Sequence, residues 1–269
     1  MRIGVKPGQW GWSYPELEAS WQAAEECGFE LVSCFDHVTD APQGLAAWNA
    51  PSLLTAMAVR TSRLRLAVDV VSTPLRHPFL LAGQVAVAQA ASDGRVELGL
   101  GAGSGLSRLD GVALGRPFPP LRERRRRLAR MCQVLPALWR GERVTDETLG
   151  IHDASLGPIS IEPPPIIVGG RSPETIEIAA RYADGWNAVT ADADEFRDLA
   201  RVADEHCARL GRRAPLAKAA QIFVGQIDRR RARELVHRLQ EAGAETAIFV
   251  LHEERGPDEV RRLAEEVLE

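Results

Sequence analysis

Residues 51–105 read PSLLTAMAVRTSRLRLAVDVVSTPLRHPFLLAGQVAVAQAASDGRVELGLGAGSG. The stretch predicts a helix, then a buried strand over 64–71, a second helix over 78–91 and a second strand over 96–100. The first strand carries the β-branched residues Val68, Val70 and Val71, and the second runs straight into glycines. Two strands joined by a helix in this way form a parallel pair whose C-terminal ends face the same side.

The alternation of strand and helix continues along the whole chain. Strands are predicted near 2–5, 31–35, 64–71, 96–101, 165–169, 186–190, 220–227 and 246–251. Helices are predicted near 15–27, 50–60, 77–91, 119–139, 173–182, 194–210, 229–242 and 257–268. Eight such units in 269 residues match a closed (β/α)8 TIM barrel, whereas an open α/β sheet more often stops at about five or six strands.

The length leaves little room for a second domain, so we expect residues 1–269 to form one barrel domain. The longest irregular stretch, 141–165, contains Gly150, Gly157 and three consecutive prolines. It is expected to be an insertion that forms a lid over the barrel mouth. The chain contains no apolar run long enough to cross a bilayer, and its N-terminus lacks the apolar core of a signal peptide. A cytoplasmic protein is therefore expected.

The charge balance argues against nucleic acid as a partner. The net charge is −4 and the pI is near 5.9, whereas a nucleic-acid binder should be basic. The arginine-rich run 122–127 spreads its side chains around a helix, and Glu123 can pair with Arg127. The run is interpreted as a solvated or intersubunit surface, with a phosphate contact as the alternative. We expect a homodimer.

No pattern in the chain predicts a metal site. The cysteines Cys27, Cys34, Cys132 and Cys207 are scattered without a CxxC pair, which is typical of a reducing compartment and excludes the usual zinc motifs. The first strand lacks the HxH pair of metal-dependent hydrolase barrels, and the six histidines are dispersed.

Six segments carry a family resemblance. They are RIGV, CGFELVSCFDH, TSRLRLAVDVVSTPLRHP, SDGRVELGLGAG, GRPFPPLRER and PPPIIVGGRSPETIEIAARYADGWN, and they cover most of residues 1–190. In this order they resemble the bacterial-luciferase-like family of flavin and deazaflavin oxidoreductases, in particular its smaller members that use coenzyme F420. The resemblance implies hydride transfer between F420 and a small organic substrate. An FMN-dependent monooxygenase and a non-catalytic flavin-binding subunit are the alternatives.

Asp36 and His37 follow the second strand, so they should lie at the end of the barrel where strand-end polar residues act in catalysis. An imidazole there can donate to a developing oxyanion or relay a proton near neutral pH. The resemblance places the matching histidine beside the reactive face of the cofactor and Asp36 near the cofactor. A structural Asp–His pair that closes a loop is the alternative.

Two further strand ends are expected to contact the cofactor ring. Val71, Ser72 and Thr73 follow the third strand, where the resemblance implies a bulge with a non-prolyl cis peptide within 70–73. Gly101, Ala102 and Gly103 end the fourth strand. Gly103 is followed by Ser104, where some deazaflavin relatives have a glutamate that exchanges a proton with substrate. Ser104 is therefore expected to contact substrate, and its presence argues against a sugar-phosphate dehydrogenase.

Gly169, Gly170 and Arg171 end the fifth strand, and Ser172 and Pro173 have the residue types of a helix N-cap and first helical position. Free backbone N–H groups at such a helix start suit a phosphate group, and the resemblance implies that use.

Three tryptophans, Trp10, Trp12 and Trp48, follow the first two strands, and either line an apolar substrate pocket or anchor loops. Trp186 is expected in the core. Asp69 lies within an otherwise apolar strand, so its charge must be paired or face the barrel mouth.

Overall fold

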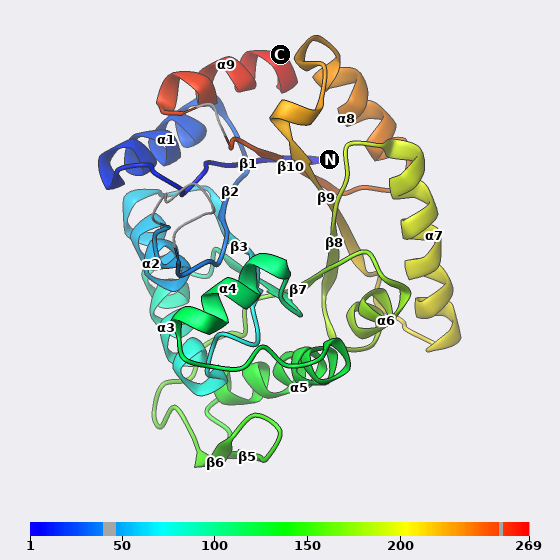
Figure 1. The fold of residues 1–269 in the computed structure, drawn as a ribbon. Coiled ribbons are helices and arrows are strands. Elements are labelled where there is room, and N and C mark those ends of the chain that lie inside the picture. The colour runs from blue at the N-terminus through cyan, green and yellow to red at the C-terminus, as the bar shows by residue number, and fades with distance from the viewer. Residues whose placement is uncertain (40–46, 253–254, 269) are drawn as a thin grey trace.

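A computed structural model describes residues 1–39, 47–252 and 255–268. Eight parallel strands close into a barrel in the order β1, β10, β9, β8, β7, β4, β3, β2, as predicted. The strands are β1 (Arg2–Lys6), β2 (Leu31–Cys34), β3 (Arg65–Ser72), β4 (Val96–Gly101), β7 (Ile166–Gly169), β8 (Gly185–Val189), β9 (Ala217–Phe223) and β10 (Thr246–Val250). Figure 1 looks into the end at which the strands finish.

Helices surround the barrel because each buries an apolar stripe against the strands. They are α1 (Tyr14–Cys27), α2 (Ala50–Arg60), α3 (Pro78–Ala91), α5 (Leu121–Trp139), α6 (Pro173–Tyr182), α7 (Ala193–Arg209), α8 (Ala232–Glu241) and α9 (Pro257–Val267). Among the described residues, no helix combines the length and apolar character that a membrane span requires. Local signals set the helix starts: the Ser172 hydroxyl accepts a hydrogen bond from Thr175 N, and Pro173 opens α6.

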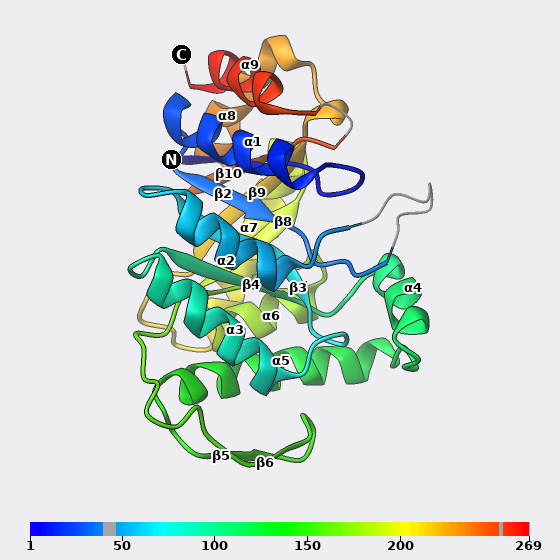
Figure 2. The same cartoon turned by 90° about the vertical axis from the view of Figure 1, so that its left-hand side faces the viewer.

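The structure adds a helix that the sequence did not predict. This helix, α4 (Gly105–Ala113), follows β4 and stands beside the barrel mouth in Figure 2. Its sequence, GLSRLDGVA, contains two glycines and two residues that favour caps, so its intrinsic helix propensity is weak. Residues 224–226 and 229–231 form short 3₁₀ turns where longer regular elements were expected.

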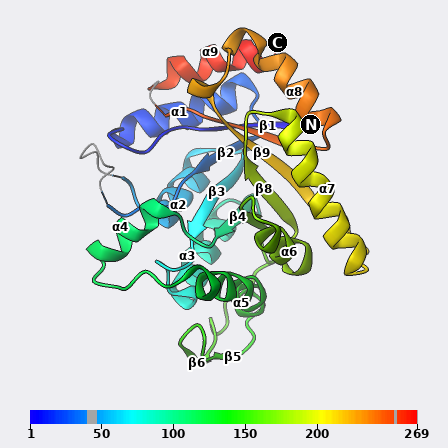
Figure 3. The same cartoon turned by 45° about the vertical axis from the view of Figure 1, so that its right-hand side comes forward.

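The insertion over 141–165 does not cover the mouth, contrary to our expectation. It forms an antiparallel hairpin of β5 (Val144–Asp146) and β6 (Ile151–Ala154) on the flank of the barrel beyond α5 (Figures 2 and 3). Two interactions with the barrel wall hold it there. Arg130 Nε of α5 donates to Asp146 Oδ2 at 2.7 Å, and the side chains of Leu149 and Ile151 are buried.

A bulge in β3 shapes the barrel interior. The register between β3 and β4 shifts between Val68 and Val71, and the peptide bond Asp69–Val70 is cis, one bond before the range expected from the resemblance. The Val70 side chain lies against glycines of β4 and of β7, the strand beyond it. A Cβ atom on Gly101 would lie 2.5 Å from Val70 Cγ2, and one on Gly169 would lie 2.7 Å from Val70 Cγ1. Glycine is required at both positions because only it leaves room for this side chain.

Candidate active site

A cavity of about 620 Å³ opens at the C-terminal end of the barrel. Its size and place are typical of small-molecule sites in TIM barrels. Eleven of the residues predicted for the site line it: Trp10, Asp36, His37, Ser72, Gly101, Ala102, Gly103, Ser104, Gly169, Gly170 and Arg171. No group of three or more His, Cys, Asp or Glu side chains in the described part of the chain is arranged to hold a metal ion.

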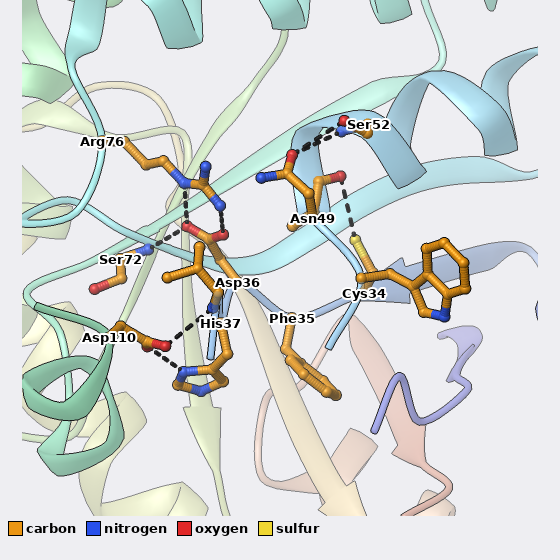
Figure 4. Close-up of polar contacts among 12 residues, drawn as sticks. Cys34, Phe35, Asp36, His37, Asn49, Ser52, Ser72, Arg76 and Asp110 are labelled. Atoms are coloured by element: carbon orange, nitrogen blue, oxygen red, sulfur yellow. Dashed lines mark hydrogen bonds and ion pairs between the residues drawn. The ribbon is translucent and has the colours of Figure 1, made fainter. Parts of the chain in front are cut away.

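His37 reaches the cavity from the loop after β2, and α4 supplies its partner (Figure 4). His37 Nδ1 lies 2.8 Å from Asp110 Oδ2, and the Asp110 side chain is fully buried. The Trp10 ring stacks on the imidazole with 5.4 Å between centroids. Because Asp110 holds Nδ1, Nε2 is the nitrogen left to act on a ligand. Asp110 is a positioning residue, and no sequence pattern relates it to His37.

Asp110 also fixes the backbone next to the histidine. Its Oδ1 accepts hydrogen bonds from Val38 N at 3.0 Å, from Thr39 N at 2.9 Å and from the Thr39 hydroxyl at 2.7 Å. Burial by itself raises the pKa of the Asp110 carboxyl group. The bonds from His37, Val38 and Thr39 outweigh burial, so the pKa lies below its ordinary value of 3.8.

We expect Asp110→Asn to lower the free energy of unfolding by about 2 kcal/mol at pH 7, because charge-assisted bonds to a buried carboxylate are lost. A depressed pKa in the folded state means that the unfolded chain binds the proton first. The contribution of the ionised carboxylate is thus present above pH 3.8 and lost as the pH falls through the lower folded pKa. Urea denaturation at pH 7 and at about pH 3.5 should show the deficit shrinking at the lower pH. A deficit that does not change with pH would contradict this account.

Asp36 lines the cavity but is engaged by protein groups (Figure 4). Two nitrogens of Arg76 donate to the Asp36 carboxylate: Nε at 3.0 Å from Oδ2, and Nη2 to Oδ1. Ser72 N also donates to Oδ2, at 3.2 Å. The Asp36 side chain is fully buried and that of Arg76 nearly so. This bidentate pair ties the loop after β2 to the loop after β3, which makes Asp36 chiefly a support for its neighbour His37.

The start of α6 forms the polar end of the cavity. Gly170, Arg171 and Ser172 line it together with Arg125 of α5. Gly170 has φ 152°, and a Cβ atom there would lie 2.6 Å from Thr175 Cγ2. Arg125 Nη2 donates to Ser172 Oγ at 2.9 Å and pairs with the exposed Glu174 at 3.1 Å, whereas Arg125 Nε is buried and has no hydrogen-bond partner within the described residues. A helix N-terminus beside a buried, unpaired guanidinium N–H suits an anionic group.

The arginine run of α5 is mostly not the solvated surface that we expected. Arg124 Nη1 donates to the carbonyl groups of Ala102 and Gly103, at 2.8 and 2.6 Å, and so holds the loop after β4. Arg127 donates to the carbonyl groups of Thr73 and Arg76 and does not pair with Glu123. Helical spacing places the arginine side chains on different faces of α5. Their hydrogen-bond partners depend on which loops pack against each face.

Four predicted site residues do not line the cavity. Val71 and Thr73 are fully buried, and Thr73 Oγ1 donates to Gly101 O at 2.9 Å. Trp12 is buried, and Trp48 is 42% exposed with its Nε1 donating to Trp12 O at 2.7 Å. These two tryptophans anchor loops, and only Trp10 faces the cavity. Trp186 is buried in the core, as expected.

Several residues that line the cavity were not predicted from the sequence. They include Lys6, Phe35, Val70, Leu106, Leu121, Arg125, Asn187, Gln221, Phe223 and His252. One signal was available for part of this set. Asn187 and Gln221 are polar residues inside predicted strands, and Lys6 directly follows the first predicted strand; such residues face the barrel mouth or its interior.

Comparison with known proteins identifies the family of this chain. The sequence profile of the luciferase-like monooxygenase family matches residues 2–267. The chain belongs to this family. The resemblance noted in six sequence segments is therefore confirmed.

Relatives within the family include dehydrogenases that use F420. The chain is 32% identical over 199 residues to the F420-dependent glucose-6-phosphate dehydrogenase of Nakamurella multipartita, covering 72% of this chain and 57% of that protein. It is 32% identical over 211 residues to the F420-dependent hydroxymycolic acid dehydrogenase of Mycobacterium tuberculosis, covering 77% of this chain and 58% of the relative. The matches thus span less than two thirds of either relative.

A solved structure shares the fold. It is an F420-dependent secondary alcohol dehydrogenase in complex with an F420–acetone adduct, with a TM-score of 0.84 over 100% of this chain and 99% of that one. Only 14% of the residues are identical, so this likeness concerns the barrel alone.

Proposed function

We propose that this protein is an F420-dependent oxidoreductase that transfers hydride between the deazaflavin and a small organic substrate. The observation that carries the proposal is that one cavity is lined both by the start of α6, whose free N–H groups suit an anionic group, and by His37, which Asp110 holds. The relatives in the family that are named as F420-dependent dehydrogenases support the choice of cofactor.

The residues of the cavity fit such a cofactor. The backbone at Gly169 and Gly170, the Ser172 N-cap and the unpaired Nε of Arg125 are suited to hold a phosphate group. Val70 fills the space beside Gly101 and Gly169 and itself lines the cavity, so its side chain offers an apolar surface on which a planar ring can pack. When bound, F420 supplies a ring carbon that accepts or donates hydride.

The chain itself supplies proton handling and positioning. Asp110 holds His37 in one orientation, so the imidazole Nε2 can take the proton of a substrate hydroxyl as its carbon gives up hydride, or return it in the reverse direction. Trp10 and Phe35 pack against the His37 imidazole and restrict the access of water to it. The two aromatic rings also contact each other, with 4.3 Å between their centroids. Ser104, at the N-terminus of α4, has no acidic group and so leaves this role to His37.

The cofactor assignment is tested by fluorescence titration of the purified protein with F420 and with FMN. We expect F420 to bind at least about tenfold more tightly than FMN, a difference of roughly 1.4 kcal/mol. With reduced FMN and isotope-labelled O₂, we expect FMN oxidation without label in any organic product. Tighter binding of FMN together with stoichiometric incorporation of the label would instead establish a monooxygenase. F420 binding without turnover over a broad panel of alcohols and carbonyl compounds would indicate a non-catalytic subunit.

A further inference from the structure

Four polar side chains form a cluster inside the barrel, at the floor of the cavity. Lys6 of β1, Asp69 of β3, Asn187 of β8 and Gln221 of β9 all line it, and none is more than 6% exposed. We call these four residues the floor cluster. The remaining side chains of these strand segments are mostly apolar, so burying the cluster is costly unless its groups are well paired.

The cluster is linked by hydrogen bonds. Lys6 Nζ donates to the backbone carbonyl of Asp69 at 2.8 Å and to Gln221 Oε1. Gln221 Nε2 donates to Asn187 Oδ1 at 2.8 Å, and Asn187 Nδ2 lies 3.4 Å from Asp69 Oδ1. From outside the cavity, the Ser33 hydroxyl donates to Asp69 Oδ2 at 2.8 Å. The network fixes each side chain in place.

These hydrogen bonds do not use all the N–H groups of the floor cluster. An ammonium carries three N–H groups and an amide carries two. Within the described residues, Lys6 uses two of its N–H groups, and Asn187 and Gln221 use one each. Each of the three nitrogens therefore keeps one N–H group without a protein acceptor, next to a cavity. Asp69, whose carboxylate also lines the cavity, retains lone pairs that can accept a bond.

The charge of Lys6 also indicates that the floor cluster binds a ligand. Its ammonium forms no ion pair with a carboxylate in the described part of the chain and donates only to neutral oxygens. Burial lowers the pKa of Lys6, and the nearby Asp69 raises it by less. A buried ammonium on a cavity wall is stabilised when a ligand brings an oxygen of partial or full negative charge to it.

We propose that Lys6, Asn187 and Gln221 bind the pyrimidinedione edge of the deazaflavin ring, with Asp69 accepting from its imide N–H. This inference rests on the proposed function. A pyrimidinedione edge presents two carbonyl oxygens with an N–H between them, which complements several donors beside one carboxylate. Hydride addition to the ring adds one hydrogen and an electron pair, so the formal charge of the ring falls by one. Lys6 then stabilises the reduced ring more than the oxidised ring.

The test is Lys6→Met, which keeps an unbranched side chain of nearly the same length and removes the charge. Dissociation constants are measured by fluorescence titration for oxidised F420 and, under anaerobic conditions, for F420 reduced chemically. We expect affinity for the reduced form to fall at least tenfold more than affinity for the oxidised form. For a two-electron couple this equals a fall of about 30 mV in the midpoint potential of the bound cofactor.

Lys218→Met is the matched control, because it makes the same substitution at a lysine that pairs with Asp204 at 2.7 Å and does not line the cavity. It should leave both dissociation constants within about twofold. Gln221→Met provides a second variant should Lys6→Met fail to fold, and it should weaken both forms at least about fivefold, since a neutral donor does not distinguish them.

The outcomes separate this inference from the proposed function. If wild-type protein does not bind F420, the proposed function fails. If wild-type protein binds F420 but folded Lys6→Met binds both redox forms as wild type does, the floor cluster does not contact the ring and only this inference is overturned. A loss of turnover in Lys6→Met with unchanged affinity for both forms also overturns it, since the cluster then serves the substrate.

Discussion

Replacing His37 by alanine should lower turnover at least about 100-fold while the affinity for F420 stays within about threefold of wild type. The reason is the position of the imidazole: Asp110 binds Nδ1 at 2.8 Å, so Nε2 is left for proton transfer at the reacting atoms, an interaction made mainly in the transition state. Turnover is followed by F420 absorbance, with a substrate found by screening alcohols and carbonyl compounds.

His237→Ala serves as the control for the His37 variant, because His237 lies exposed on α8 and does not line the cavity. It should retain full activity. Added imidazole should restore part of the activity of His37→Ala, which a purely structural histidine would not allow. A His37→Ala protein with wild-type turnover would assign the histidine to loop closure, the alternative that the sequence left open.

Arg125→Met should weaken F420 binding about 30-fold, or roughly 2 kcal/mol, because a charge-assisted bond to an anionic group is lost. Arg125 Nε is buried beside the α6 N-terminus and has no partner in the described residues, so it is the donor best placed to bind a phosphate. The measurement is a fluorescence titration with F420 at two salt concentrations. The variant should also show a weaker dependence of affinity on salt.

Arg126→Met is the matched control for Arg125→Met. Arg126 is the next residue on α5, carries the same charge and is exposed away from the cavity. It should bind F420 as wild type does. Equal affinities of the two variants would place the anionic tail of the cofactor elsewhere on the barrel.

Local sequence patterns determined the barrel. The β-branched run of β3, the apolar stretch of β4 and the helical periodicity between them depend on neighbours within a few residues, so they can be read directly. The same holds for the α6 start, where Ser172 and Pro173 define an N-cap. Asp36 and His37 could be placed at the mouth because every parallel strand of a barrel ends on that face.

Tertiary structure alone decided which of these residues work together. His37 and Asp110 are 73 residues apart, and Lys6 and Gln221 are 215 apart, so no local pattern relates them. The segment carrying Asp110 has weak helix propensity, and α4 forms where its buried face packs beside the mouth. Which tryptophan or arginine faces the cavity likewise depends on loops packed from elsewhere in the chain. Periodicity fixes elements, but contacts between distant elements fix the site, because side-chain partners are chosen by packing in three dimensions.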